Sequence, residues 1–344
     1  MLKQVFVLLF FLLITFQFTM AQKTNAPIAI AVHGGASNLL KLNLSPEQQK
    51  AYKDTLQLAL EAGYSILKKG GTSVDAVQAA IHVLENSVLF NAGKGSVLTH
   101  NKTIEMDAAI MRGDSLKAGA VAEVKTIKNP IDAARKVMDS SKFIFLSGAG
   151  AEEFAQKHGV QIVDTNYFFT PYRIQQLEKI IDTDTVLLDH TDTTGMIVPA
   201  DKNAEDKYGT VGCVALDQFG NLAAGTSTGG IVNKRYNRIG DSPLIGCGTY
   251  ANNKTCAVSC TGKGEDFIRL VVAHDISAMM QYRYMSVKRA ARKVIMKKLT
   301  AAGGRGGCIA IDRKGNITMP YNTDGMFRGY IDKKGNLKVM IFEN

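Results

Sequence analysis

Gly209 and Thr210 are the residues of this 344-residue chain whose types and spacing point most clearly to a chemical reaction. They open a stretch that reads Gly-Thr-Val-Gly-Cys-Val-Ala-Leu-Asp. A threonine hydroxyl is a weak nucleophile as long as the nitrogen of the same residue is held in a peptide bond. Cleavage between Gly209 and Thr210 would release this nitrogen as an amine, whose ordinary pKa of roughly 7.7–8.0 lets it accept a proton near neutral pH. Thr210 would then supply nucleophile and base together. The plain alternative is a strand that begins after a glycine turn.

A second threonine, Thr228, lies in a hydroxyl-rich turn at the end of the next apolar run. The turn, residues 225–230, reads Gly-Thr-Ser-Thr-Gly-Gly and combines hydroxyl groups with flexible backbone. We expect Thr228 to hydrogen-bond the Thr210 hydroxyl and to orient it. Taken alone, the same residues fit a polar turn equally well.

Two further pairs of residues have the types that an amino-acid substrate requires. Arg238 offers a guanidinium fork for a carboxylate, and Asp241 offers an acid for an ammonium group. Thr261 and Gly262 end an apolar strand and precede a helix, so they can present a hydroxyl and a backbone N–H to an oxyanion. The structural alternatives are a surface ion pair for Arg238 and Asp241, and a helix cap for Thr261 and Gly262.

Glycine-rich patterns elsewhere do not support a nucleotide site. Residues 246–251 fit G-x-G-x-x-A, but a strand rather than a helix is expected after them. Residues 148–150 lack the third small residue, and residues 262–264 lack the hydroxyl that follows a P-loop lysine.

The cysteines and histidines show no zinc-binding spacing, because no Cys/His couple accompanies Cys256 and Cys260. Several cysteines lie in apolar strand patterns, where cysteine is an ordinary small core residue. An odd count in an exported protein also permits disulfides and a free thiol. The five cysteines are Cys213, Cys247, Cys256, Cys260 and Cys308.

The first 21 residues have the pattern of a signal peptide. Lys3 precedes an apolar run from Val5 to Phe16, and small residues follow at Thr19 and Ala21. An uncleaved membrane anchor is the alternative, but the run is shorter than the ~20 apolar residues that a span needs. We therefore expect cleavage after Ala21, an exported protein that is periplasmic or secreted, and no membrane contact thereafter.

The basic charge does not point to nucleic acid. Loss of Lys3 lowers the formal net charge from +10 to +9, and the remaining basic residues are scattered. The one dense stretch, Lys288 to Lys298, suits the solvated face of a helix.

The order of predicted elements favours a layered α+β fold, a four-layer αββα sandwich, over a doubly wound sheet. No linker divides the chain, so we expect one domain over residues 22–344. Residues 182–206 are polar and resemble a connector in front of Thr210. Asp-x-x-Gly-Asn turns beginning at Asp217, Asp312 and Asp332 predict β-hairpins. Predicted strands cover 28–33, 104–111 and 118–124. Predicted helices cover 45–69, a segment from Thr72 or Ser73 past Leu84, 130–138, 149–157, 171–181, 265–280 and 286–299.

Several of these segments resemble the plant-type asparaginase/isoaspartyl peptidase family of N-terminal nucleophile hydrolases. The resemblance covers nearly the whole mature chain, in order. It rests on motifs beginning at Val32 (Val-His-Gly-Gly-Ala), Leu84 (Leu-Glu-Asn-x-x-Leu-Phe-Asn-Ala-Gly-x-Gly), Gly209, Thr226 (Thr-Ser-Thr-Gly-Gly), Arg238 (Arg-x-Gly-Asp-Ser-Pro-Leu-Ile-Gly), Tyr250 (Tyr-Ala-Asn-Asn), Ser259 (Ser-Cys-Thr-Gly-x-Gly-Glu-x-Phe-Ile-Arg) and Pro320 (Pro-x-Asn-Thr-x-Gly-Met-x-Arg-Gly).

The resemblance implies autocleavage into an α chain, residues 22–209, and a β chain, residues 210–344, and a dimer of two such αβ units (a heterotetramer). It implies that Thr210 is the nucleophile and Thr228 its helper, and that Arg238 and Asp241 bind the α-carboxylate and α-amine of the substrate. The resemblance also assigns an oxyanion hole to Thr261 and Gly262, backbone contacts to Gly264, and a place near the nucleophile to Asn91.

No cofactor is implied for catalysis, but a structural sodium ion is. The stretch Leu84 to Lys94 matches the family's loop that wraps this ion through backbone carbonyls, which suit a hard cation. The implied carbonyl ligands belong to Leu84, Glu85, Ser87, Phe90, Ala92 and Lys94.

The resemblance implies an amidohydrolase that acts on β-aspartyl (isoaspartyl) peptides and L-asparagine through a β-aspartyl ester and releases L-aspartate. One alternative is a glycosylasparaginase, because residues 192–196 (Asp-Thr-Thr-Gly-Met) resemble the cleavage junction of that related group. They lack a following Thr-Ser-Thr-Gly-Gly turn at the right distance. The other alternative is a homologue that binds aspartate without cleaving itself. Cys213, where small apolar residues are common, is expected in the core.

Overall fold

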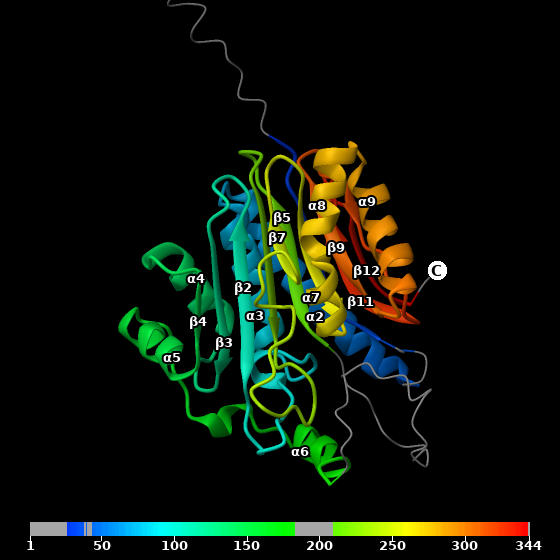
Figure 1. Ribbon diagram of the computed structural model, residues 1–344. Helices are drawn as coiled ribbons and strands as arrows, with labels where there is room; N and C mark the ends of the chain where they lie inside the picture. The colour runs from blue at the N-terminus through cyan, green and yellow to red at the C-terminus, as the bar shows by residue number, and fades with distance from the viewer. Residues whose placement is uncertain (1–25, 38, 40–42, 183–208, 343–344) are drawn as a thin grey trace, which may run out of the picture.

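Two β-sheets face each other between two layers of helices (Figure 1). The computed structural model describes residues 26–182 and 209–342, except 38 and 40–42. Within these residues the order of layers is helices, large sheet, small sheet, helices. The predicted αββα sandwich is therefore confirmed.

The large sheet contains eight strands in the order β12-β11-β1-β5-β6-β2-β3-β4. Neighbouring strands are antiparallel except β3 and β4, which are parallel. The nucleophile candidate lies at the start of a central strand, β5. In chain order the strands are β1 (Ala29–Ser37), β2 (Met106–Arg112), β3 (Ala118–Val124), β4 (Phe145–Ser147), β5 (Val211–Leu216), β6 (Leu222–Thr228), β11 (Gly325–Ile331) and β12 (Leu337–Phe342).

The small sheet contains four strands in the order β10-β9-β8-β7, all antiparallel. It packs over the centre of the large sheet, and one of its strands, β8, ends with the predicted oxyanion residues. The strands are β7 (Thr249–Ala251), β8 (Cys256–Gly262), β9 (Gly306–Asp312) and β10 (Ile317–Thr318).

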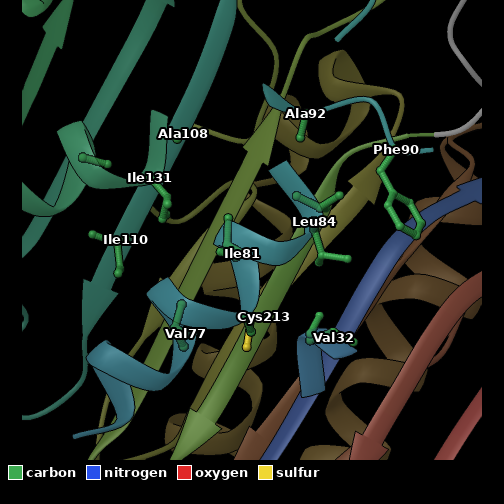
Figure 2. Close-up of a cluster of buried hydrophobic side chains, with 14 of the residues drawn as sticks. Val32, Val77, Ile81, Leu84, Phe90, Ala92, Ala108, Ile110, Ile131 and Cys213 are labelled. Carbon is green, nitrogen blue, oxygen red and sulfur yellow. The ribbon is translucent and has the colours of Figure 1, made fainter. Parts of the chain in front are cut away.

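Helices α2 (Pro46–Lys68), α3 (Ser73–Glu85) and α4 (Pro130–Ser140) cover the outer face of the large sheet. Ser45 and Gln48 form a capping box at the start of α2, and Thr72 caps α3. Figure 2 shows apolar side chains of α3 meeting those of the sheet. These local signals explain why both helix starts were predictable.

The alternation of side chains along β5 decides where chemistry can occur. Val211 and Cys213 pack in the cluster under the helices, whereas Val214 and Leu216 pack between the two sheets. Successive strand residues face opposite sides. Thr210 therefore belongs to the face that looks toward the small sheet.

The helices outside the small sheet differ from the prediction. The helix expected over 265–280 is two helices, because Val271 adopts a left-handed conformation with φ 48°. The helix expected over 286–299 continues as a π-helix after Lys293. The elements are α7 (Gly264–Leu270), α8 (Val272–Arg283), α9 (Val287–Lys293) and the π-helical η4 (Val294–Leu299).

Smaller elements were also missed or misjudged in length. The first strand extends past His33 to Ser37, because a bulge between His33 and Gly35 lets pairing with β11 continue. The expected helix 171–181 ends at Glu178. The other elements are η2 (Gly93–Gly95), α5 (Gly148–Lys157), η3 (Thr165–Phe168) and α6 (Pro171–Glu178).

The three predicted hairpin turns are confirmed. In each one the aspartate side chain accepts hydrogen bonds from the backbone N–H groups two and four residues later. The glycine of each turn has positive φ: 77° at Gly220, 72° at Gly315 and 83° at Gly335. A side chain there would be strained.

Two segments with earlier predictions lie outside the described residues. Residues 1–25 contain the expected signal peptide, and residues 183–208 contain most of the expected connector and the rival junction 192–196. Across the residues that are described, no helix has both the length and the apolar character of a membrane span.

All five cysteines are free thiols, and Cys213 lies in the core under α3 (Figure 2). Burial raises the pKa of its thiol, so the thiolate is disfavoured. We expect Cys213→Ala to lower the free energy of unfolding by about 1–2 kcal/mol, through a small cavity, and to leave turnover within about twofold of the parent. Denaturant unfolding and steady-state kinetics of the same samples check this. A loss of turnover with unchanged stability would assign Cys213 a chemical role.

Candidate active site

Thr210 and Thr228 are neighbours across two central strands. The ladder pairs Val211 with Ser227, and one step further it brings Thr210 opposite Thr228. The Thr210 hydroxyl donates a hydrogen bond of 3.1 Å to Oγ1 of Thr228. The predicted contact between nucleophile and helper is therefore present in the intact chain.

A small pocket opens beside this pair. Its volume of about 10 Å³ is the space of roughly one water molecule. Gly209 lines the pocket, so the residue before the nucleophile occupies part of the site. The lining residues are Gly209, Thr210, Thr228, Gly230, Ile231, Arg238, Gly240, Asp241, Ser242 and Gly262.

Arg238 lines this pocket and forms an ion pair with Glu265. Its Nε and one terminal nitrogen donate to the two carboxylate oxygens of Glu265, at 2.9 and 3.0 Å. Glu265 is half exposed, whereas Arg238 is largely covered. Arg238 is thus held in place by Glu265 at the edge of the pocket, in a position to meet an anionic group.

Asp241 has the features of a carboxylate that could bind a cationic group. Its side chain is buried, and Oδ2 has no hydrogen-bond partner. Burial raises the pKa of Asp241 to about 7, although the nearby Arg238 acts in the opposite direction. A buried carboxylate oxygen without a partner is unfavourable for the folded state alone. A ligand ammonium would satisfy it.

Thr261 and Gly262 are the last two residues of β8. Gly262 lines the pocket and has φ 154°, and a Cβ there would lie 2.4 Å from the carbonyl oxygen of Arg305. The Thr261 hydroxyl is fully buried and has no hydrogen-bond partner. The structure thus places Gly262 at the pocket, whereas Thr261 directly precedes it on β8 and does not line the pocket.

Gly264, at the start of α7, brings its backbone close to the clamp. A Cβ on Gly264 would lie 2.7 Å from a guanidinium nitrogen of Arg238 and 3.0 Å from the backbone nitrogen of Asp241. A Cβ on Gly240 would lie 2.9 Å from the same guanidinium group. At Gly264 a side chain would press on the backbone of Gly240 and Asp241, whereas at Gly240 it would displace only the end of the Arg238 side chain.

Asn91 supports the site from behind. Its side-chain amide donates 2.7 Å to the carbonyl oxygen of Gly230, and its side-chain oxygen accepts from the N–H of Val97. Gly230 in turn donates to the Thr228 hydroxyl at 3.1 Å. Asn91 therefore contacts the turn that carries Thr228 and does not line the pocket itself, and its expected place near the nucleophile stays a prediction.

Known proteins resemble this chain over nearly its whole length. A family model described as Asparaginase matches residues 26–341. The isoaspartyl peptidase of Escherichia coli (strain K12) is 46% identical over 301 residues, which cover 88% of this chain and 92% of that protein. The isoaspartyl peptidase/L-asparaginase of Mus musculus is 40% identical over 299 residues, 87% of this chain and 86% of that protein. The chain belongs to the asparaginase family.

The loop expected to bind sodium in this asparaginase-family chain brings backbone carbonyls together. A Cβ on Gly95 would lie 2.1 Å from the carbonyl oxygen of Phe90 and 3.0 Å from that of Ser87. A Cβ on Gly93 would lie 2.3 Å from the carbonyl oxygen of Glu85. The two glycines thus keep a cradle of carbonyls open. Among the described residues, no group of three or more His, Cys, Asp or Glu side chains is arranged to hold a metal ion.

The Glu85 side chain has a role that the asparaginase resemblance did not predict. It is fully buried, and it accepts hydrogen bonds from the Ser227 hydroxyl at 2.6 Å, the Asn129 amide at 3.0 Å and the N–H of Ile131 at 3.1 Å. Burial raises its pKa to about 7. Glu85 therefore connects the loop to the strand that ends in Thr228.

Four pocket residues of this asparaginase-family chain were not singled out individually: Gly230, Ile231, Gly240 and Ser242. Each lies within or beside a motif that was, so the signal was the motif itself. Which of its members face the pocket depends on backbone geometry that a motif does not reveal.

Proposed function

We propose that this chain is a threonine amidohydrolase that cleaves β-aspartyl (isoaspartyl) peptides and L-asparagine and releases L-aspartate. The observation that carries the proposal is the Thr210–Thr228 hydrogen bond at a pocket whose far side holds Arg238 and the unpartnered Asp241. The names of the relatives agree with this substrate class.

The reaction would begin with cleavage of the Gly209–Thr210 bond, which frees the Thr210 amine. Gly209 lines the pocket beside the nucleophile, and the pocket has room for only about one water molecule. Release of the α-chain end would therefore create both the base and the space for a substrate.

In turnover, Thr210 Oγ1 would attack the β-carbonyl carbon, while its proton passes to the free amine. The tetrahedral oxyanion would be stabilised by the Thr261 hydroxyl and the Gly262 N–H. The amine would then protonate the leaving nitrogen, which leaves a β-aspartyl ester on Thr210. Water, deprotonated by the same amine, would hydrolyse this ester and release aspartate.

Arg238 and Asp241 would hold the α-carboxylate and α-ammonium groups of the substrate. A zwitterionic α-carbon requires one charge of each sign at a fixed spacing, and the pocket offers both. Because the scissile group is then the side-chain carbonyl, the clamp favours β-aspartyl bonds over ordinary peptide bonds.

Intact mass, N-terminal sequencing and three substrates test the proposal. We expect two fragments, one of which begins Thr-Val-Gly, and turnover of a β-aspartyl dipeptide and L-asparagine. A preference for a sugar-linked asparagine, or a new terminus at Thr193 or Thr194, would support a glycosylasparaginase instead. An uncut chain that binds aspartate without turnover would support a binding protein.

The same proposal includes a structural sodium ion in the loop Leu84 to Lys94. The carbonyls of Glu85, Ser87 and Phe90 that surround the glycine cradle fit a hard cation, and bound sodium would stiffen the loop that carries Asn91. The expected role is structural and not chemical, and no catalytic cofactor is proposed.

Sodium binding predicts ion-specific stabilisation. Replacing choline chloride by NaCl at constant ionic strength is expected to raise Tm by several degrees, because an ion that binds only the folded state stabilises it by RT ln(1 + [Na⁺]/Kd). Differential scanning fluorimetry over a series of concentrations checks this. Equal Tm values in both salts would contradict the site.

We further propose that the mature protein is an exported dimer of αβ units. The export proposal rests on residues 1–21 and the assembly proposal on the family resemblance. Light scattering after size exclusion would give twice the mass of one αβ unit, and N-terminal sequencing of the α chain from an exported fraction would begin at Gln22.

The pH dependence of inhibition by L-aspartate distinguishes Asp241 from the Thr210 amine. Asp241 must be ionised to hold the ammonium group, so we expect the Ki of L-aspartate to rise as pH falls through about 7. Protonation of the Thr210 amine would instead strengthen binding of the β-carboxylate. A Ki that falls steadily with decreasing pH would therefore contradict the role of Asp241.

A further inference from the structure

Three residues from three adjacent strands form one row across the large sheet. The register places Thr210 opposite Thr228 and Thr228 opposite Asp107. Directly opposite residues of antiparallel strands project to the same face, with Cβ atoms roughly 4.5–5.5 Å apart. In Figure 2, the neighbouring Ala108 and Ile110 belong to the cluster under α3, so Asp107 is on the other face, as Thr210 and Thr228 are.

Asp107 is buried, and only one of its two carboxylate oxygens has a hydrogen-bond partner. Its Oδ1 accepts a 3.0 Å hydrogen bond from the N–H of Glu123, and its Oδ2 has no hydrogen-bond partner. The side chain is 0% exposed. A strand residue of an ordinary core would be apolar here, because an unpartnered carboxylate oxygen is unfavourable in the interior.

The Thr228 hydroxyl lacks an acceptor for its own proton. Its Oγ1 accepts hydrogen bonds from Thr210 Oγ1 and from the N–H of Gly230, both at 3.1 Å. With both acceptor positions in use, its own proton needs an acceptor elsewhere. The free oxygen of the residue opposite is a carboxylate.

Burial raises the pKa of Asp107, and the charge of the nearby Lys234 acts in the opposite direction. Lys234 is itself buried, and its ammonium lies 3.1 Å from the position of a Cβ on Gly230. Lys234 donates to the carbonyl oxygen of Glu105 at 2.8 Å and lies 3.8 Å from the Glu105 carboxylate. A positive charge is thus built in beside the row.

We propose that Asp107 is a positioning residue: its second carboxylate oxygen accepts a hydrogen bond from the Thr228 hydroxyl, directly or through one water, and so holds Thr228 as an acceptor for the nucleophile. Asp107 acts through Thr228 and does not touch the substrate. The inference rests on the proposed function, because it assigns a role within the threonine nucleophile's own hydrogen-bond chain.

The test compares Asp107→Asn with Glu105→Gln. The asparagine can still accept from Glu123, but its second polar atom is a donor unless the amide turns, so it cannot satisfy both Glu123 and Thr228. Glu105→Gln removes a carboxylate from the same lysine without touching the row. We expect Asp107→Asn to lower kcat and the rate of chain cleavage about 10- to 100-fold with little change in KM. Glu105→Gln should keep both rates near the parent values at a similar change in Tm.

A double-mutant cycle with Thr228→Ala distinguishes a role through Thr228 from a purely structural role of Asp107. If Asp107 acts through Thr228, Asp107→Asn should slow chain cleavage in the parent but not in the Thr228→Ala background. Equal slowing in both backgrounds, or equal losses for Asp107→Asn and Glu105→Gln, would overturn the proposal.

Two further outcomes are separable. A parent protein without turnover of β-aspartyl substrates refutes the proposed function, whereas an active parent with an equally active Asp107→Asn refutes the inference alone. If Asp107→Asn does not fold, Asp107→Ser enters the same cycle, since its smaller hydroxyl lacks the carboxylate and fits the same space.

Discussion

Thr210→Ala is expected to remain a single uncut chain and to lose turnover by at least about 10⁴-fold, because it lacks both the hydroxyl and the route to the free amine. The effect is so large because two functions belong to one residue. The intact chain already holds the Thr210 hydroxyl 3.1 Å from Thr228 beside Gly209, so the same hydroxyl serves the cleavage and the turnover. Intact mass spectrometry and a coupled assay for released aspartate measure both losses.

Thr210→Ser and Thr193→Ala are the matched controls. Serine retains a hydroxyl and, once the chain is cut, an amine, so we expect a slower but complete cleavage and measurable turnover. Thr193→Ala should behave as the parent does. An uncut Thr193→Ala with a normally processed Thr210→Ala would move the nucleophile to the rival junction and contradict the assignment.

Asp241→Asn is expected to lower kcat/KM for β-aspartyl substrates about 10²- to 10³-fold. Loss of one partner of a buried charge pair has an effect of about 2–5 kcal/mol, and the expected range corresponds to about 3–4 kcal/mol. The change keeps the shape of the side chain but removes the charge that would meet the substrate ammonium. Steady-state kinetics on a β-aspartyl dipeptide give the value.

The same substitution should not destabilise the fold, and this separates binding from folding. The pKa of Asp241 is raised from 3.8 to about 7 by burial, so the folded state holds the proton more tightly than the unfolded chain does. The contribution of this group to stability is therefore lost as pH rises from about 4 to about 7. Asp241→Asn avoids that loss, and its Tm should equal or exceed the parent value at pH 8 and approach it near pH 4.

Glu265→Gln is the control for the kinetic effect of Asp241→Asn. Glu265 holds Arg238 at the mouth of the pocket but is half exposed, so its loss should lower kcat/KM by less than about tenfold. A larger effect for Glu265→Gln than for Asp241→Asn would mean that the clamp depends mainly on the placement of Arg238.

Much of the fold followed from short-range signals. The caps at Ser45 and Thr72, the Asp-x-x-Gly-Asn turns and the alternation along β5 each depend on residues within a few positions of one another. Predictions failed where packing overrides local preference. The single helix expected over 265–280 is broken at Val271, a β-branched residue that local preference would not place in a left-handed conformation.

The candidate site was predicted in a similar way. Thr210, Thr228, Arg238, Asp241 and Gly262 all line one pocket, and each comes from a motif of consecutive residues. Asn91 was expected close to the nucleophile, but its path through Gly230 was not predictable. Neither the hydrogen bond between Glu85 and Ser227 nor the position of Asp107 opposite Thr228 was predicted from the sequence.

The sequence by itself determined most of the elements, the nucleophile candidate and the polar groups around it, because these depend on local spacing and residue type. Only the tertiary structure decided that Asp107 lies opposite Thr228 and that Glu85 reaches Ser227 across 142 positions. The physical reason is that strand order and register bring together residues far apart in the chain. Burial then sets their energetics, and neither can be obtained from one segment at a time.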